Sequence, residues 1–433
     1  MLSHAEKVGR VSGQLRERKS LAPVTLKKKG VSHQMPKPFD KKYSDEKLDI
    51  SDFDDILSID PAERICLAEP GVSFSDLVAA TLKHGLVPMT VPEHKGITIG
   101  GAVAGGSLES MSYKYGGFHD SCLEYEVVTA KGDVLTCTPE KDSLIFQMLH
   151  STFGTLGILT RLKFRLIPAQ KYVKIVYEKY DSIESYKAGI LSHYEKHDID
   201  FMDGMIFSQN NCVLSTGYFT DKAPFSHSYE WTRAYFPTVQ KGKVDYIETA
   251  DYFFRYDNGN TDVFPKSFLG RLLLGKFLGS STTLKLAEKL RKVMPLPVTA
   301  DLFIPFSKLT DFMHWYGKNV DFFPLWCVPY RLGRKYEWMS EQFIKRSPDE
   351  LFIDLAIYGM RRYDKNYYRL IEEELIRIGG IKALISSNYF TEDEFWTIWN
   401  RDNYFKVKQQ TDPDNILRDL YEKTCVAAMG LGR

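Results

Sequence analysis

The feature that most constrains this chain is a glycine-rich stretch, residues 85–117, which reads GLVPMTVPEHKGITIGGAVAGGSLESMSYKYGG. It is too rich in glycine to form a core and too apolar to be a linker. Glycine lets the backbone approach a ligand closely, and successive free N–H groups in such a loop can bind an anion. The stretch therefore predicts a backbone shaped for ligand contact, with a cluster of ordinary β-turns as the simpler alternative. Its interior glycines and hydroxyl residues are at positions 96, 100, 101, 105, 106, 116 and 117 and at 98, 107, 110 and 112.

The length and charge of the chain limit the number of domains and the kinds of binding partner that can be expected. A length of 433 residues predicts two domains, because a single core rarely grows so large. The 57 basic and 56 acidic residues leave a formal charge of +1, so no nucleic-acid partner is expected. An aromatic content of 13% fits either large cores or a pocket for a flat or greasy ligand.

The cysteines and the N-terminus indicate a cellular location. The six cysteines show no CxxC spacing and no ligand-like spacing with histidine, so no metal site is predicted and a reduced protein is expected. The first 20 residues carry charges throughout and lack the apolar core of a signal peptide. No run approaches the roughly 18 apolar residues of a spanning helix. We expect a cytoplasmic protein and leave peripheral membrane contact open.

Periodicity and capping residues predict the elements of the first 170 residues. A helix is expected over 3–18, because Val8, Val11 and Leu15 recur at helical spacing and Ser3 with Glu6 matches a capping box. The last strand alternates apolar and basic residues, which indicates one buried and one exposed face. Further helices and strands are expected at 75–84 and 142–150, and at 23–26, 48–59, 64–69, 124–130, 134–136 and 154–168.

After Pro168 the pattern changes to that of a second α+β unit. A helix is expected over 182–197. The stretch 264–295 is predicted to be a buried helix interrupted by glycines, with a helix lying on a membrane surface as the alternative. Strands are expected at 173–180, 201–207, 212–219, 301–305, 325–332 and 351–357.

Four segments, taken in order, resemble a family signature. They are 97–102 (ITIGGA), 115–116 (YG), 124–136 (EYEVVTAKGDVLT) and 154–158 (GTLGI). This pattern is similar to the FAD-binding half of the vanillyl-alcohol oxidase or PCMH-type family. The resemblance implies an α+β fold, in which an FAD-binding domain of two small α/β subdomains is joined to an α+β cap domain. It implies the division 1–170 for the FAD domain, 171–385 for the cap, and 386–433 for a return onto the FAD domain.

The same resemblance implies which residues bind FAD. In the family a glycine-rich turn after the first strand holds the diphosphate, whereas here three lysines precede a single glycine. Lysine can still bind phosphate as a point charge. His33 is where some members attach flavin covalently, although a loop histidine is more often just exposed. The predicted cofactor-binding residues are Lys28, Lys29, Gly30, Val31, Ser32, His33, Pro92, Glu93, Thr98, Ile99, Gly100, Gly101, Ser107, Ser110, Tyr115, Gly116, Gly154, Thr155, Gly157 and Ile158.

Further segments are similar to the Δ24-sterol reductase (Diminuto-like) branch of this family. They include 85–93, 109–116, 167–174, 251–253, 324–329 and 394–396, so the likeness covers nearly the whole chain. The chain departs from the eukaryotic sterol enzymes at its lysine-rich loop and in lacking their N-terminal membrane anchor. Both departures point toward the soluble bacterial-type relatives of the branch, some of which resemble flavin reductases that saturate a methylene group on a fatty acyl chain.

The resemblance implies a reductase of a C=C bond in a small-molecule lipid, with NADPH as the transient donor of electrons to FAD. Hydride would reach one carbon while an acid supplies a proton to the other. The candidate acids are Tyr389, Tyr252 and Glu109, each with an ordinary structural role as the alternative. Arg255 could hold a carboxylate or a phosphate, but an ion pair with Asp257 or Asp251 is the simpler expectation.

Two other functions are left open by the sequence. One is an FAD-dependent oxidase or dehydrogenase of an alcohol or hydroxy acid, which would place Arg and His rather than aromatic residues in the cap. The other is a lipid-binding scaffold whose flavin site has decayed. Neither the substrate nor the oligomeric state follows from the sequence.

Overall fold

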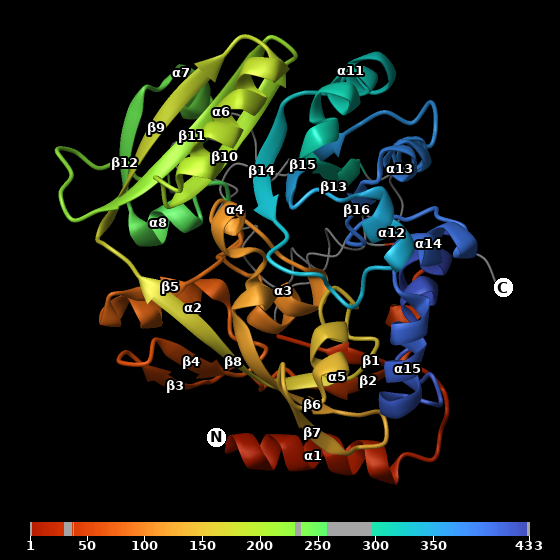
Figure 1. The fold of residues 1–433 in the computed structure, drawn as a ribbon. Helices are drawn as coiled ribbons and strands as arrows, with labels where there is room; N and C mark the ends of the chain where they lie inside the picture. The colour runs from red at the N-terminus through yellow and green to blue at the C-terminus, as the bar shows by residue number, and fades with distance from the viewer. Residues whose placement is uncertain (1, 30–36, 38, 230–234, 258–296, 431–433) are drawn as a thin grey trace, which may run out of the picture.

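The computed structural model describes residues 2–29, 37, 39–229, 235–257 and 297–430, and it contains two main sheets, one above the other (Figure 1). The six-stranded sheet spans residues 56–168 and the eight-stranded sheet residues 172–382. Helices α3 (Ile99–Gly105) and α4 (Ser112–Tyr115) lie between the sheets. The predicted α+β fold is confirmed, and the glycine-rich stretch lies at the junction of its two sheets.

The six-stranded sheet has the order β3-β4-β8-β6-β7, and β5 pairs with β8. The hairpin predicted around Gly132 is confirmed, and so are the predicted helices at 75–84 and 142–150, which are α2 (Phe74–Thr81) and α5 (Ser143–Met148). The strands of this sheet are β3 (Ile56–Asp60), β4 (Ile65–Ala68), β5 (Leu86–Pro88), β6 (Cys122–Val128), β7 (Val134–Cys137) and β8 (Ile158–Pro168).

The first helix, α1 (His4–Glu17), confirms the predicted capping box. Ser3 accepts the N–H of Glu6, and the Glu6 carboxylate accepts the N–H of Ser3. Val8, Val11 and Leu15 are buried in a small core that also contains β1 (Val24–Lys27). The apolar spacing of the sequence therefore identifies the face of α1 that packs against the domain.

The single strand predicted over 48–59 is wrong. The chain forms β2 (Glu46–Asp49), which pairs in parallel with β1, and then turns before β3. The Asp49 carboxylate accepts the backbone N–H of Ser51 at 2.9 Å, and Phe53 N–H bonds to Ile50 C=O. An aspartate that bonds to the backbone two residues later favours a turn over a continued strand.

The eight-stranded cap sheet has the order β12-β9-β11-β10-β14-β15-β13-β16. Neighbouring strands pair antiparallel throughout the described part of this sheet, and its predicted strands are confirmed. The stretch predicted to be helical at 264–295 lies outside the described residues. The strands are β9 (Tyr172–Tyr180), β10 (Phe201–Ser208), β11 (Asn211–Thr220), β12 (Val244–Glu248), β13 (Val298–Pro305), β14 (Leu325–Arg331), β15 (Leu351–Met360) and β16 (Ile381–Lys382).

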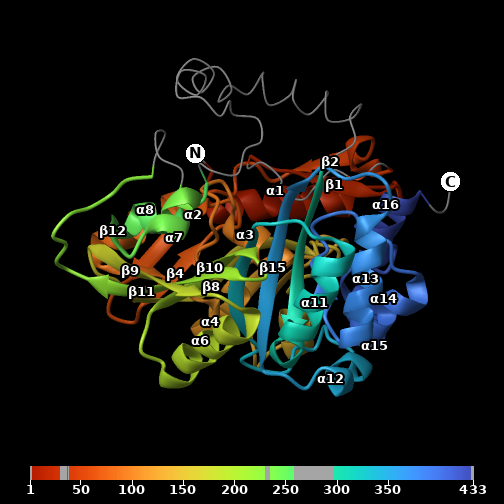
Figure 2. The same ribbon diagram turned by 90° about the horizontal axis from the view of Figure 1, so that it is seen from above.

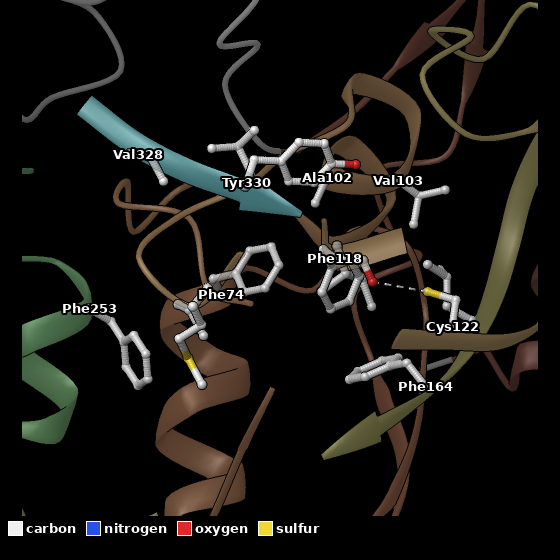
Figure 3. Packing of buried hydrophobic residues seen from close by; sticks show 14 of the residues in the cluster. Phe74, Ala102, Val103, Phe118, Cys122, Phe164, Phe253, Val328 and Tyr330 are labelled. Atoms are coloured by element: carbon white, nitrogen blue, oxygen red, sulfur yellow. Dashed lines mark hydrogen bonds between the residues drawn. The ribbon is translucent and has the colours of Figure 1, made fainter. Parts of the chain in front are cut away.

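The cap sheet separates two cores. Helices α6 (Ile183–Lys196), α11 (Leu309–Asn319) and α13 (Tyr367–Ile378) cover one face (Figure 2). The opposite face, called here the inward face, joins the core of the FAD-side sheet. Figure 3 shows Tyr330 of β14 beside Ala102 of α3, with Val328 farther back along the same strand, and all three belong to one buried cluster. Because alternate residues of a strand point to opposite faces, this register decides which cap residues meet the glycine-rich stretch.

The C-terminal segment contains α14 (Glu392–Ile398), α15 (Arg401–Thr411) and a π-helical turn, Glu422–Val426. Figures 1 and 2 show α14 and α15 at the opposite end of the molecule from β12. Tyr404 donates a hydrogen bond to Thr155 Oγ1 at 2.8 Å, and Lys408 donates to Thr155 C=O at 2.9 Å. The segment thus contacts the turn before β8, while the exact division of the chain at 170 and 385 remains a prediction.

Candidate active site

Helix α3 presents the most open backbone of the glycine-rich stretch. Thr98 caps the helix by accepting the N–H of Gly101. A Cβ on Gly101 would meet only the Thr98 hydroxyl, at 3.2 Å, and a Cβ on Gly105 would meet nothing within 4 Å. In contrast, a Cβ on Gly100 would lie 2.5 Å from Pro70 Cβ. Gly100 is therefore required by packing, whereas Gly101 and Gly105 leave space for a bound group.

The loop between α3 and α4 carries a fully buried carboxyl group. Glu109 is 0% exposed, and its Oε2 accepts hydrogen bonds from both the N–H and the hydroxyl of Ser110. Its own N–H donates to Ser112 Oγ at 2.9 Å, and Ser110 C=O accepts the N–H of Met202 at 2.7 Å. The loop is thus held by its own side chains and by cap strand β10.

Glu109 belongs to a buried ionic group of three residues, called here the acid triad: Glu109, Arg255 and Asp203. Arg255 Nη2 lies 2.9 Å from Asp203 Oδ2 and 3.1 Å from Glu109 Oε1. All three side chains are at most 2% exposed. Arg255 thus forms ion pairs with Glu109 and Asp203, whereas the simpler expectation was a pair with Asp257 or Asp251. The triad joins the FAD-side loop to the inward face of the cap.

Tyr252, on helix α8 (Thr249–Phe253), extends the acid triad. Its hydroxyl donates to Ser110 Oγ at 3.3 Å, and the Arg255 guanidinium lies 4.0 Å from its ring centroid. Burial raises the pKa of the Tyr252 phenol well above its usual value, and Arg255 opposes this rise. Two of the three predicted catalytic residues, Glu109 and Tyr252, are thus linked through Ser110.

Burial raises the pKa of Glu109 to about 7. Arg255 opposes this rise, and the negative charge of Asp203 adds to it. Asp203 Oδ2 also accepts the Tyr256 hydroxyl at 2.7 Å and the Trp326 indole N–H at 3.0 Å. With a pKa of about 7, Glu109 can exchange a proton near neutral pH.

A second group of acids lies at the junction of the glycine-rich stretch and the cap. His94 Nδ1 is 3.0 Å from Asp257, and its Nε2 is 3.3 Å from Glu93. Burial alone would lower the pKa of His94, but these carboxylates raise it to about 9. Burial raises the pKa of Asp301 to about 7 and the pKa of Asp354 well above its usual value. The negative charge of the nearby Glu93 also raises both pKa values.

Lysines gather around Lys28, the first residue of the segment predicted to bind the diphosphate. Lys37 is 4% exposed, and its Nζ has no hydrogen-bond partner among the described residues. Burial lowers its pKa to about 7, an effect that Asp40 opposes and Lys42 reinforces. Burial also lowers the pKa of Lys423 to about 7, and repulsion from Lys28 contributes. Neighbouring lysines repel one another here, and a bound anion such as a diphosphate would relieve this repulsion.

The remaining predicted cofactor residues differ in how much open space surrounds them. Gly154 has a φ of +68°, and a Cβ there would meet nothing within 4 Å. A Cβ on Gly116 or Gly157 would instead collide with Asp120 or Val127. Lys29 Nζ lies 2.5 Å from Asp54. Gly30, Val31, Ser32 and His33 lie outside the described residues; Ile99, Ile158, Pro92 and Glu93 are buried, and Ser107 and Tyr115 are partly exposed.

Tyr389, the third predicted catalytic residue, lies apart from the acid triad. Its backbone N–H donates to Glu372 at 3.0 Å, and its ring stacks on Tyr368 with centroids 6.1 Å apart. The analysis of the sequence missed Asp203, Asp301 and Asp354 as site residues. Each of these residues is an aspartate in an otherwise largely apolar strand, and this pattern in the sequence could have identified them.

Comparison with known proteins supports the flavin assignment. A family model described as an FAD binding domain matches residues 20–138. Human Δ24-sterol reductase is 28% identical over 402 aligned residues, covering 86% of this chain and 77% of the human protein. The Arabidopsis thaliana Δ24-sterol reductase is 24% identical, covering 97% of this chain and 84% of its own. Cytokinin dehydrogenase 7 of Oryza sativa subsp. japonica is 26% identical, with coverage of 55% and 48%.

The chain is an FAD-linked oxidoreductase. Its predicted PCMH-type FAD-binding domain and its resemblance to the Δ24-sterol reductases are confirmed. The open glycines of α3 and the lysine group fit a flavin dinucleotide, because they offer accessible backbone and unneutralised cations. Among the described residues, no helix of this flavoenzyme is long and apolar enough to cross a membrane.

Proposed function

We propose that this flavoenzyme reduces a C=C bond of a small-molecule lipid, with NADPH as the electron donor. The substrate is a sterol with a side-chain double bond or a methylene-bearing acyl lipid. FAD supplies the hydride when bound. The Δ24-sterol reductases that resemble most of the chain support this class of reaction.

The composition of the inward face carries the proposal. This face presents Phe201, Trp326, Tyr330 and Phe352, which are at most 6% exposed and belong to the core shared with the FAD-side sheet. An oxidase of alcohols or hydroxy acids would need a base and cationic groups for a polar substrate. Here the cations at the junction are already paired with carboxylates: Arg255 with Glu109 and Asp203, and His94 with Glu93 and Asp257. An apolar surface with protonated carboxyl groups suits the addition of a proton to an alkene.

The chain's own residues would hold the cofactor and substrate in defined roles. We propose that the backbone at Thr98, Gly101 and Gly154 lies against FAD, and that Lys28 and Lys423 neutralise its diphosphate. No separate dinucleotide fingerprint accompanies the FAD motif, so the nicotinamide would reach the flavin transiently. A cytoplasmic location with peripheral membrane contact is part of the same proposal.

The first experiment is an absorption spectrum of the purified protein, followed by anaerobic addition of NADPH. We expect flavin bands that bleach with NADPH and recover when an unsaturated lipid is added. A sterol alkene and a methylene-acyl phospholipid, each with its saturated analogue as control, would distinguish the two lipid classes. Bands that bleach with an alcohol or hydroxy acid but not with NADPH would contradict the proposal.

A further inference from the structure

We infer that Glu109 is the acid that gives the substrate its proton, and that Asp203, Arg255 and Tyr252 position it. This inference rests on the proposed function, because it names the residue that completes C=C reduction. Glu109 is a carboxyl group of the glycine-rich stretch that contacts residues of the cap unit, Asp203 through Arg255, and it lies in the loop that directly follows α3.

The two oxygens of Glu109 have different surroundings. Oε2 accepts two hydrogen bonds from Ser110, so it is held by its own loop. Oε1 has no hydrogen-bond partner among the described residues, although it lies 3.1 Å from Arg255 Nη2. Oε1 is therefore the atom that can carry the transferable proton. Once the proton has left, the adjacent guanidinium stabilises the carboxylate that remains.

Tyr252 is a positioning residue rather than the acid. Its hydroxyl donates to Ser110 Oγ, which in turn donates to Glu109 Oε2. Burial raises the pKa of this phenol well above its usual value, so Tyr252 stays protonated. Its hydrogen bond orients Ser110 and thereby fixes Glu109. Tyr389 instead contacts Glu372 through its backbone N–H and Tyr368 through its ring.

Charged and polar groups from the elements that pack against Glu109 determine its pKa. Asp203 of β10 contributes a negative charge, and Arg255, after α8, contributes a positive one. The phenols of Tyr252 and Tyr256 and that of Tyr235, from α7 (Tyr235–Lys241), surround Arg255 and remain neutral because burial raises their pKa values. The balance leaves Glu109 protonated below about pH 7 and ionised above it.

The proposed step balances atoms and electrons. The alkene π pair forms one new C–H bond with the proton of Glu109, and the hydride of the reduced cofactor forms the other. The cofactor is left oxidised and is reduced again by NADPH. Glu109 is left as a carboxylate beside Arg255, and it takes up a proton from solvent between turnovers.

The test compares Glu109→Gln with Glu374→Gln in the FAD-loaded enzyme. Glu374 is a buried glutamate on α13 that pairs with Arg377, outside the triad. We expect Glu109→Gln to slow reoxidation of the reduced flavin by the unsaturated lipid by about 100-fold. Reduction of the flavin by NADPH should be unchanged in both variants. An unchanged lipid-dependent rate in a folded Glu109→Gln enzyme would overturn the inference.

Infrared spectroscopy gives a readout that is independent of turnover. Wild type should show C=O bands of buried protonated carboxyl groups that titrate near neutral pH, and the wild-type minus Glu109→Gln difference spectrum should contain the band of Glu109, while that of Asp301 is present in both proteins. In Asp203→Asn the loss of a negative neighbour should shift this titration, and the alkaline limb of lipid reduction, toward lower pH. An unshifted limb would refute the role of Asp203. If no unsaturated lipid reoxidises the wild-type flavin, the proposed function itself has failed.

Discussion

The buried carboxyl group of Glu109 should make the stability of the protein depend on pH in a way that one substitution removes. Its pKa rises from about 4.5 in the unfolded chain to about 7 in the folded protein. A raised carboxyl pKa means that the folded state binds more protons than the unfolded state between these values. Stability therefore falls as pH rises from about 4.5 to 7, and the loss is complete above that range.

The size of this effect follows from the pKa shift. A shift of about 2.5 units at about 1.4 kcal/mol per unit corresponds to about 3 kcal/mol. For a chain of 433 residues, an unfolding entropy of about 2 cal/mol/K per residue converts this to about 3 to 4 °C in Tm. Glu109→Gln lacks the ionisable group and should not lose this stability.

The assay is differential scanning calorimetry of wild type, Glu109→Gln and Glu374→Gln at pH 5 and pH 7.5. Part of the loss has already occurred at pH 5, so the Tm of Glu109→Gln relative to wild type should rise by about 3 °C between the two pH values. The relative Tm of Glu374→Gln should stay constant, because Glu374 is outside the acid triad. A constant difference for Glu109→Gln would refute the raised pKa and the charge balance derived from the triad.

Three further substitutions test separate parts of the structure. Gly100→Ala places a Cβ 2.5 Å from Pro70 Cβ, so calorimetry should show a loss of about 1 to 3 kcal/mol. Lys423→Met removes a cation of the lysine group, and titration of the apoprotein with FAD should show roughly tenfold weaker binding without a change of fold; unchanged affinity would contradict its role at the diphosphate. Tyr404→Phe removes the hydrogen bond to Thr155, and a loss of about 1 kcal/mol is expected, whereas an unchanged Tm would mean that this contact is replaced by water.

Local patterns predicted most elements of this fold because they act over a few residues. The capping box at Ser3 and Glu6 begins α1, and alternating side chains mark β8 and the cap strands. The failure at 48–59 has the same local origin, because the Asp49 side chain bonds to the Ser51 N–H and ends a strand that apolar content alone would extend. The spacing of apolar residues does not report whether a side chain will bond to a neighbouring backbone N–H, so this spacing alone could not predict the turn.

The sequence alone determined that this chain binds FAD, because the motif depends on glycines and hydroxyl groups at short, fixed spacings. Only the tertiary structure decided which acid has an altered proton affinity. Glu109 lies in the FAD-side loop, whereas Asp203 and Arg255 follow much later in the chain. Packing of the two sheets brings Arg255 Nη2 within 2.9 Å of Asp203 and 3.1 Å of Glu109. Burial and the proximity of charges set a pKa, and both depend on contacts between residues far apart in sequence.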